Sequence, residues 1–229
     1  MAIRALVFDF DGVVIDTETP DFATWQEVFD DHGVGLDHEL WSGFIGGGPG
    51  EFNVYDHLEE LVGRALDRDV IRADRRRRYL DAVASSPVLP GVEALVLDAR
   101  ARSLRLAVAS SSGREWVEGH LEMRGLLSYF EAIRTRDDVA TVKPDPELFA
   151  SALDALGVEP ADAIAIEDSA NGVTAATVAG MFCVVVPNAM TEAMPLDHAD
   201  LRLRSLAGVS LDYLIEAATA HTGAGGQRC

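Results

Sequence analysis

Residues 3–12 read IRALVFDFDG, a short apolar run that stops at Asp9, Asp11 and Gly12. A continuous, β-prone apolar run that ends in a turn signal is typical of a buried strand. Similar runs recur at residues 104–109, 132–135, 163–166 and 182–186, and helical patterns lie between them at residues 92–102, 115–127, 146–156 and 170–179. Buried strands that alternate with helices predict a doubly wound α/β domain whose parallel sheet is covered on both faces.

One segment, residues 16–87, breaks this alternation directly after the first predicted strand. It contains amphipathic stretches at residues 22–31 and 55–66 and a glycine-rich sequence at residues 46–50, without a candidate for a buried strand. This pattern predicts a separate helical insertion. We therefore expect two domains: an α/β core formed by residues 1–15 and 88–229, and a helical cap formed by residues 16–87.

The composition excludes several classes of protein. The chain has 229 residues with 38 acidic against 19 basic side chains, a net charge of −19, so it lacks the basic surplus that nucleic-acid binding requires. We find no signal peptide and no apolar run of membrane-spanning length, and Cys183 and Cys229 form neither a disulfide framework nor a metal motif. We expect a cytoplasmic protein, a monomer or weak homodimer, with no nucleic-acid or membrane partner.

Reactive residue types gather where the predicted strands end. The first strand is followed by Asp9 and Asp11, the second by Ser110, Ser111 and Ser112, and the fourth by Glu167 and Asp168. Lys143, the only lysine among 19 basic residues, lies in the loop after the third strand. Ligands of open parallel sheets bind beyond the carboxyl ends of the strands, so these residues are expected on one rim.

This set of residue types favours phosphoryl chemistry. Clustered carboxylates repel one another unless a hard divalent cation lies between them, and oxygen ligands without a matching set of His or Cys indicate Mg²⁺. An ammonium group and hydroxyls beside the cation can hold phosphoryl oxygens, while an Asp-x-Asp pair can divide nucleophilic attack from proton transfer. The alternative, that these acids are solvated turn residues or helix caps, has to hold at every strand end at once.

Four motifs, in this order, resemble those of the haloacid dehalogenase superfamily of aspartate-nucleophile phosphohydrolases. They are residues 8–14 (FDFDGVV), 108–110 (VAS), 143–146 (KPDP) and 166–169 (IEDS), the last with Gly172. The resemblance covers most of the chain and is to the branch with a helical cap like β-phosphoglucomutase. It implies a Rossmann-like core with an inserted α-helical cap, in agreement with the pattern of strands and helices.

The resemblance also implies a role for each site residue. Asp9 is expected to attack phosphorus and form an aspartyl-phosphate, and Asp11 to protonate the leaving group and then activate water. Three residues are expected to hold the phosphoryl oxygens: Ser110, Ser111 and Lys143. Four are expected to bind Mg²⁺: Asp9, Asp11 through its backbone carbonyl, Asp168, and Glu167 either directly or through water. Ser169 and Asn171 are expected to cap the next helix.

Other activities of the superfamily fit the sequence less well. The metal-free dehalogenases lack an acid at the position of Asp11, and the phosphonate-cleaving branch needs a cap lysine where this cap has none. Phosphoglucomutase-like mutases have a cap histidine where this chain has Asp21, and basic residues in the loop that reads GGGPGEF here at residues 46–52. We expect a Mg²⁺-dependent phosphomonoester hydrolase acting on a small phosphorylated metabolite, the alternatives being a mutase or a catalytically silent binding module.

The cap offers several candidates for contacts with the substrate. We expect specificity contacts from Asp21, Gly47 and Phe52, with Phe44 nearby, although the two phenylalanines are equally well explained as cap core. The Arg75–Arg78 run, flanked by acids, is interpreted as a solvated helix face. The three tryptophans are interpreted as core or cap packing: Trp25, Trp41 and Trp116.

Overall fold

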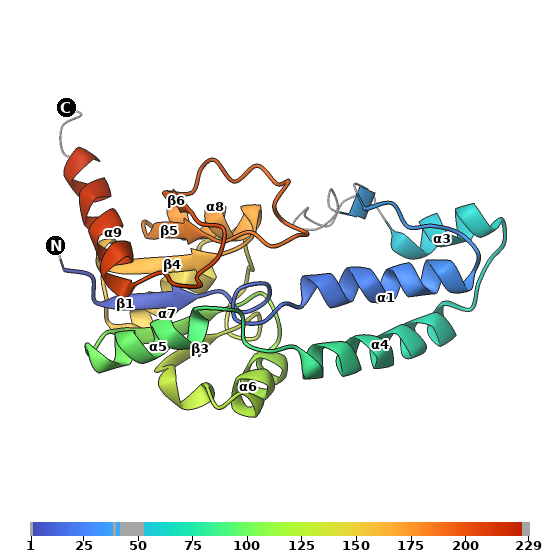
Figure 1. The fold of residues 1–229 in the computed structure, drawn as a ribbon, viewed down its shortest axis with the longest axis horizontal. Coiled ribbons are helices and arrows are strands. Elements are labelled where there is room, and N and C mark those ends of the chain that lie inside the picture. The colour runs from blue at the N-terminus through green and yellow to red at the C-terminus, as the bar shows by residue number, and fades with distance from the viewer. Residues whose placement is uncertain (1, 39, 42–52, 226–229) are drawn as a thin grey trace.

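The computed structural model describes residues 2–38, 40–41 and 53–225. Its centre is a six-stranded parallel sheet with the order β3-β2-β1-β4-β5-β6 (Figure 1). The strands are β1 (Ala5–Phe8), β2 (Arg105–Ala109), β3 (Ala132–Arg134), β4 (Ala163–Glu167), β5 (Phe182–Val185) and β6 (Leu201–Arg202). The first five confirm the predicted α/β core. The sixth was not predicted, because a two-residue edge strand is too short to show a periodic pattern.

Helices cover both faces of this sheet. They are α5 (Val92–Ala101), α6 (Arg114–Met123), α7 (Glu147–Leu156), α8 (Ala170–Val178) and α9 (Leu211–Gly225), with short 3-10 turns η1 (Leu127–Tyr129) and η2 (Pro160–Asp162). None of the helices in the described ranges has both the length and the apolar character needed to cross a membrane.

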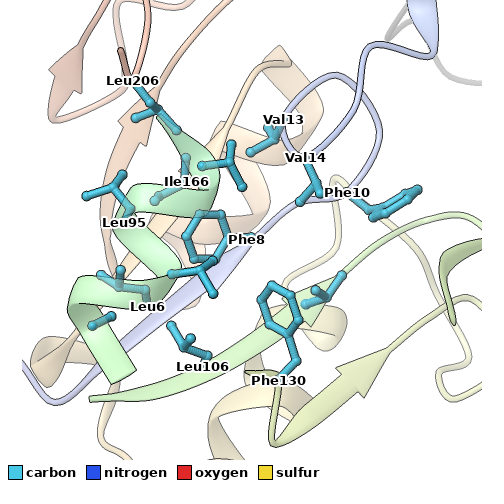
Figure 2. Packing of buried hydrophobic residues seen from close by; sticks show 14 of the residues in the cluster. Leu6, Phe8, Phe10, Val13, Val14, Leu95, Leu106, Phe130, Ile166 and Leu206 are labelled. Atoms are coloured by element: carbon cyan, nitrogen blue, oxygen red, sulfur yellow. The ribbon is translucent and has the colours of Figure 1, made fainter. Parts of the chain in front are cut away.

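Side chains of β1 alternate between two apolar layers, as the pleat of a strand requires. Leu6 and Phe8 pack in one layer with residues of α5, α6 and α9, and Figure 2 shows this layer around them. Ala5 and Val7 pack in the other layer with residues of α7 and α8. β1 lies between β2 and β4 in the interior of the sheet. Because all four of its side chains are also fully buried, its carboxyl end is held at a fixed place.

The described residues between β1 and α5 include the helices α1 (Glu18–Asp31), α3 (Val54–Val62) and α4 (Arg68–Ser85). They extend beyond the carboxyl end of β1 (Figure 1) and share a small apolar core that includes Phe29, Trp41 and Leu58. The side chains of Asn53 and Asp67 begin α3 and α4 by accepting hydrogen bonds from backbone N–H groups of the first turn.

The arginine run of α4 differs from its interpretation as a solvated face. Arg75 pairs with Asp21 of α1 at 2.5 Å, and its guanidinium lies 4.5 Å from the ring centre of Trp25. Arg78 pairs with Asp31 of α1 at 2.8 Å as well as with Asp74 of its own helix. The interpretation was wrong for these two arginines because it considered only acids on the same helix, whereas α1 supplies acidic partners across the helix pair.

The buried layer should dominate stability. Leu106 of β2 is fully buried, so Leu106→Ala should lower the free energy of unfolding by about 3 kcal/mol through lost burial and the cavity that remains. Leu97→Ala on α5, where the leucine is 44% exposed, is the matched control and should cost under about 1 kcal/mol. Urea unfolding of both variants measures the difference, and equal losses would contradict the assignment of this layer as the core.

Candidate active site

The turn after β1 delivers Asp9 into the interior. Asp9 is 7% exposed, and its backbone N–H continues the sheet by donating to the carbonyl of Ile166 at 2.8 Å. Gly12 follows with φ +78°, and a Cβ there would lie 2.3 Å from Oδ2 of Asp168. Only glycine therefore permits both this turn and the neighbouring carboxylate.

Asp9 belongs to a buried cluster of three carboxylates. Oxygen atoms of Asp9, Glu167 and Asp168 lie within 4.8 Å of one another, and all three side chains are buried. Burial, reinforced by the neighbouring carboxylates, holds the pKa of Asp9 and of Asp168 well above the usual range. Ionised carboxylates are therefore unfavourable at this site unless positive charge is brought to them.

Lys143 brings one positive charge to this cluster. Its ammonium group donates to Asp9 and, at 2.6 Å, to Oε1 of Glu167, and its side chain is only 6% exposed. Burial by itself would lower the pKa of Lys143, but attraction to these two carboxylates outweighs burial and raises it above its ordinary value. One ammonium against three ionised carboxylates leaves an excess of two negative charges, a charge balance that fits a divalent cation.

Glu167 is held from two sides. Its Oε2 accepts hydrogen bonds from the backbone N–H of Asp168 at 3.0 Å and from the hydroxyl of Ser169 at 3.2 Å. Ser169 also caps α8 by accepting from the N–H of Gly172, as the sequence predicted. A Cβ on Gly172 would lie 1.9 Å from Cδ of Glu167, so this glycine leaves the space that the carboxylate occupies.

Asp11 lies in different surroundings from Asp9. Its Oδ2 accepts from the hydroxyls of Ser112 at 2.6 Å and Ser110 at 3.3 Å, and its Oδ1 accepts from the indole N–H of Trp116 at 2.9 Å. Trp116 packs against the core, as predicted, and its indole N–H in addition contacts this carboxylate, which the sequence did not indicate. The two serine hydroxyls and the indole keep this carboxylate outside the cluster of Asp9.

Asn188 is a site residue that the sequence analysis missed. Its side-chain amide N–H donates to Oδ2 of Asp168 at 2.7 Å, and its side-chain oxygen Oδ1 accepts from the backbone N–H of Met190 at 2.9 Å. Asn188 follows β5 after Pro187, at the same edge of the sheet as the other strand ends. The rule that located Asp9 and Asp168 would have found it, had the fifth strand end been included.

A cavity of about 950 Å³ opens beside Asp11. Its walls come from α1, α4, α6 and the loops after β2 and β3, and include Asp21, Ser111 and Trp116. Asp21, predicted as a substrate contact, lines this space, and its carboxylate is paired with Arg75. The other predicted cap contacts lie outside the described residues: Phe44, Gly47 and Phe52.

Glu18 adds an unpredicted titratable group to this cavity wall. Burial, with repulsion from Asp11, Asp21 and Asp16, raises the pKa of Glu18 from 4.5 to about 7. No motif marked this residue, because its pKa depends on carboxylates that only the folded chain brings near it.

Comparison with known proteins identifies one family of hydrolases and several of its members as similar to this chain. Residues 3–180 match the model of the haloacid dehalogenase-like hydrolase family. The chain is 44% identical over 214 residues to the putative phosphatase YhcW of Bacillus subtilis, covering 93% of this chain and 97% of the relative. It is 32% identical to the validoxylamine A 7′-phosphate phosphatase of Streptomyces hygroscopicus, covering 92% and 98%. The crystal structure of CbbY from Rhodobacter sphaeroides in complex with phosphate superposes with a TM-score of 0.69 at 28% identity, covering 91% and 96%.

The raised pKa of Glu18 has a consequence for stability. Because its folded-state pKa of about 7 exceeds the ordinary 4.5, the folded chain holds the proton more tightly, and stability falls as pH rises through that interval. Between pH 4.5 and 7, the free energy of unfolding of the wild type should fall by about 2–3 kcal/mol relative to that of Glu18→Gln. Urea unfolding of both proteins at several pH values measures this difference, and a difference that does not change with pH would refute the assignment.

Proposed function

Because the chain belongs to the haloacid dehalogenase-like hydrolase family, we propose that it is a Mg²⁺-dependent phosphomonoester hydrolase that forms an aspartyl-phosphate at Asp9. The observation that carries this proposal is the buried ion pair of Asp9 with Lys143 at the end of the central strand. A carboxylate there is shielded from water and lies beside a cation, the arrangement that a phosphorus-attacking nucleophile needs. The proposed substrate is a small phosphorylated metabolite.

The residues divide the reaction into two steps. In the first, a carboxylate oxygen of Asp9 forms a bond to phosphorus, the ester P–O bond breaks, and Asp11 gives its proton to the departing oxygen. In the second, Asp11 takes a proton from water as the water oxygen attacks phosphorus, which releases inorganic phosphate and restores Asp9. Lys143 is the proposed partner of the phosphoryl oxygens, with Ser110 and Ser111 from the loop after β2.

The donor set fits magnesium. Carboxylate oxygens without histidine or cysteine are the ligands of a hard cation, and the excess of two negative charges matches a divalent one. We propose that Asp9, Glu167 and Asp168 hold Mg²⁺ together with the backbone carbonyl of Asp11. When bound to these residues, Mg²⁺ would supply positive charge that offsets the negative charge of a transferring phosphoryl group.

Residues 16–87 are proposed as a cap that moves relative to the core of residues 1–15 and 88–229. The two connections run side by side, since Ile15 bridges to Val88 and the N–H of Leu89 donates to the carbonyl of Val14 at 2.9 Å. Two adjacent connecting segments can serve as a hinge. Cap opening about this hinge would admit the substrate, and closing would exclude water. The cavity beside Asp11 lies between the cap helices and the core, where the leaving group would be bound.

Water is the proposed acceptor of the phosphoryl group. A mutase must hold a second phosphate, and Asp21 adds negative charge to the cavity while engaging Arg75, which is therefore not free for a phosphate. Conversion of β-glucose 1-phosphate to the 6-phosphate in the presence of a bisphosphate activator would favour the mutase instead. A silent binding module is disfavoured because every predicted catalytic residue is present in the chain.

Asp9→Asn should abolish turnover, because the amide is a poor nucleophile. With p-nitrophenyl phosphate and Mg²⁺, we expect kcat to fall at least about 10³-fold while the fold is retained. Turnover by the wild type should disappear in EDTA and return with excess Mg²⁺. Initial rates, with circular dichroism and thermal unfolding as checks of folding, provide the measurement.

Asp154→Asn, which changes an exposed carboxylate on α7, is the matched control and should keep wild-type rates. Acid-quenched wild type should retain label from a radiolabelled phosphate ester, and Asp9→Asn should not. Full activity of Asp9→Asn, or turnover that persists in EDTA, would remove the proposed nucleophile or the proposed metal from the mechanism.

A further inference from the structure

The indole of Trp116 lies where the proposed cap meets the proposed core. Trp116 lies in the first turn of α6, and its ring stacks on Tyr79 of α4 with centroids 5.8 Å apart and an interplanar angle of 10°. His120, one turn further along α6, packs edge-to-face against the same ring, with the ring centroids 4.1 Å apart. These two contacts fix the direction of the indole N–H, which points at Oδ1 of Asp11.

We propose that Trp116 is a positioning residue for Asp11, one that orients this carboxyl group for proton transfer to the leaving group. The inference rests on the proposed function, since it concerns how Asp11 performs its part. It goes beyond that function because the motifs that indicate the chemistry do not include Trp116.

The hydrogen bonds assign different roles to the two oxygens of Asp11. An indole N–H can only donate, so Oδ1 must be an acceptor whenever the contact is present. Oδ2 faces the hydroxyls of Ser110 and Ser112, and a hydroxyl can either donate or accept. When Asp11 holds the proton that it delivers, Oδ2 is therefore the oxygen that carries it, and the hydroxyls that donate to Oδ2 in the structure turn to accept. After the transfer, the hydroxyls turn to donate to the newly formed carboxylate.

The same indole connects the cap to this proton transfer. Tyr79 belongs to α4 within residues 16–87, whereas Trp116 belongs to the core. The guanidinium of Arg75 lies 5.6 Å from the ring centre of Tyr79 and pairs with Asp21, which extends the chain of contacts to α1. The position of the cap helices thus bears on the orientation of Asp11 through a single aromatic stack.

Trp116→Phe tests the positioning role, because phenylalanine keeps an aromatic ring for Tyr79 and His120 but has no N–H. The probes are phenyl phosphate and p-nitrophenyl phosphate, which differ only in the nitro group. Phenolate is much the more basic leaving group and depends on a proton from Asp11, whereas p-nitrophenolate departs without one. We compare kcat/KM, which reports steps up to the first P–O cleavage and excludes hydrolysis of the aspartyl-phosphate.

The variant should lose roughly tenfold or more in kcat/KM for phenyl phosphate and under about threefold for p-nitrophenyl phosphate. Tyr213→Phe, which changes an exposed tyrosine of α9 that does not line the cavity, is the control and should leave both values unchanged. Tyr79→Leu, which removes the stack, should show the same selective loss as Trp116→Phe, though smaller.

If Trp116→Phe lowers kcat/KM equally for the two esters, or for neither, the positioning role is overturned while the proposed hydrolase activity stands. A wild type that hydrolyses neither ester in Mg²⁺ would overturn the proposed function and this inference with it. Thermal unfolding of each variant separates these outcomes from a general loss of fold, which would lower both values together and count against a specific role.

Discussion

The site depends on the two buried ion pairs that the ammonium group of Lys143 forms with Asp9 and Glu167. They join the loop after β3 to the ends of β1 and β4, so three segments must converge for them to form. Removing one partner of such a buried pair typically costs roughly 3–5 kcal/mol, because the other charge is left uncompensated. Gly12 and Gly172 support the arrangement by leaving room for the carboxylates, where any side chain would collide.

The two aspartates of the first motif, although separated by only one residue, have different environments. Asp9 is buried beside a cation, which suits a nucleophile that must become a covalent ester of phosphate. Asp11 faces a cavity and is surrounded by hydrogen-bond donors, which suits a group that gives and takes protons. The turn that follows β1, with Gly12 at φ +78° and Asp11 bridged to Ile15, separates the two side chains. Their different neighbours then give each carboxylate its own chemistry.

The sequence was sufficient for the α/β core and for the residues at most strand ends, because buried strands and turn residues leave local patterns. It was insufficient where a property depends on partners distant in the chain. The hydrogen bond from Trp116 to Asp11, the contact of Asn188 with Asp168 and the pairing of Arg75 across two helices all belong to this kind. Spacing along one element indicates which face a residue occupies but not which side chain meets it there.

If the buried carboxylates, incompletely neutralised by one lysine, form a site for a divalent cation, the protein must bind Mg²⁺ in the absence of any substrate. Calorimetric titration of MgCl₂ into the wild type, Asp168→Asn and Asp154→Asn tests it most directly, without relying on a substrate. We expect saturable one-site binding of Mg²⁺ to the wild type and to Asp154→Asn, and loss of that binding in Asp168→Asn. Equal binding by all three proteins, or none by the wild type, would contradict it.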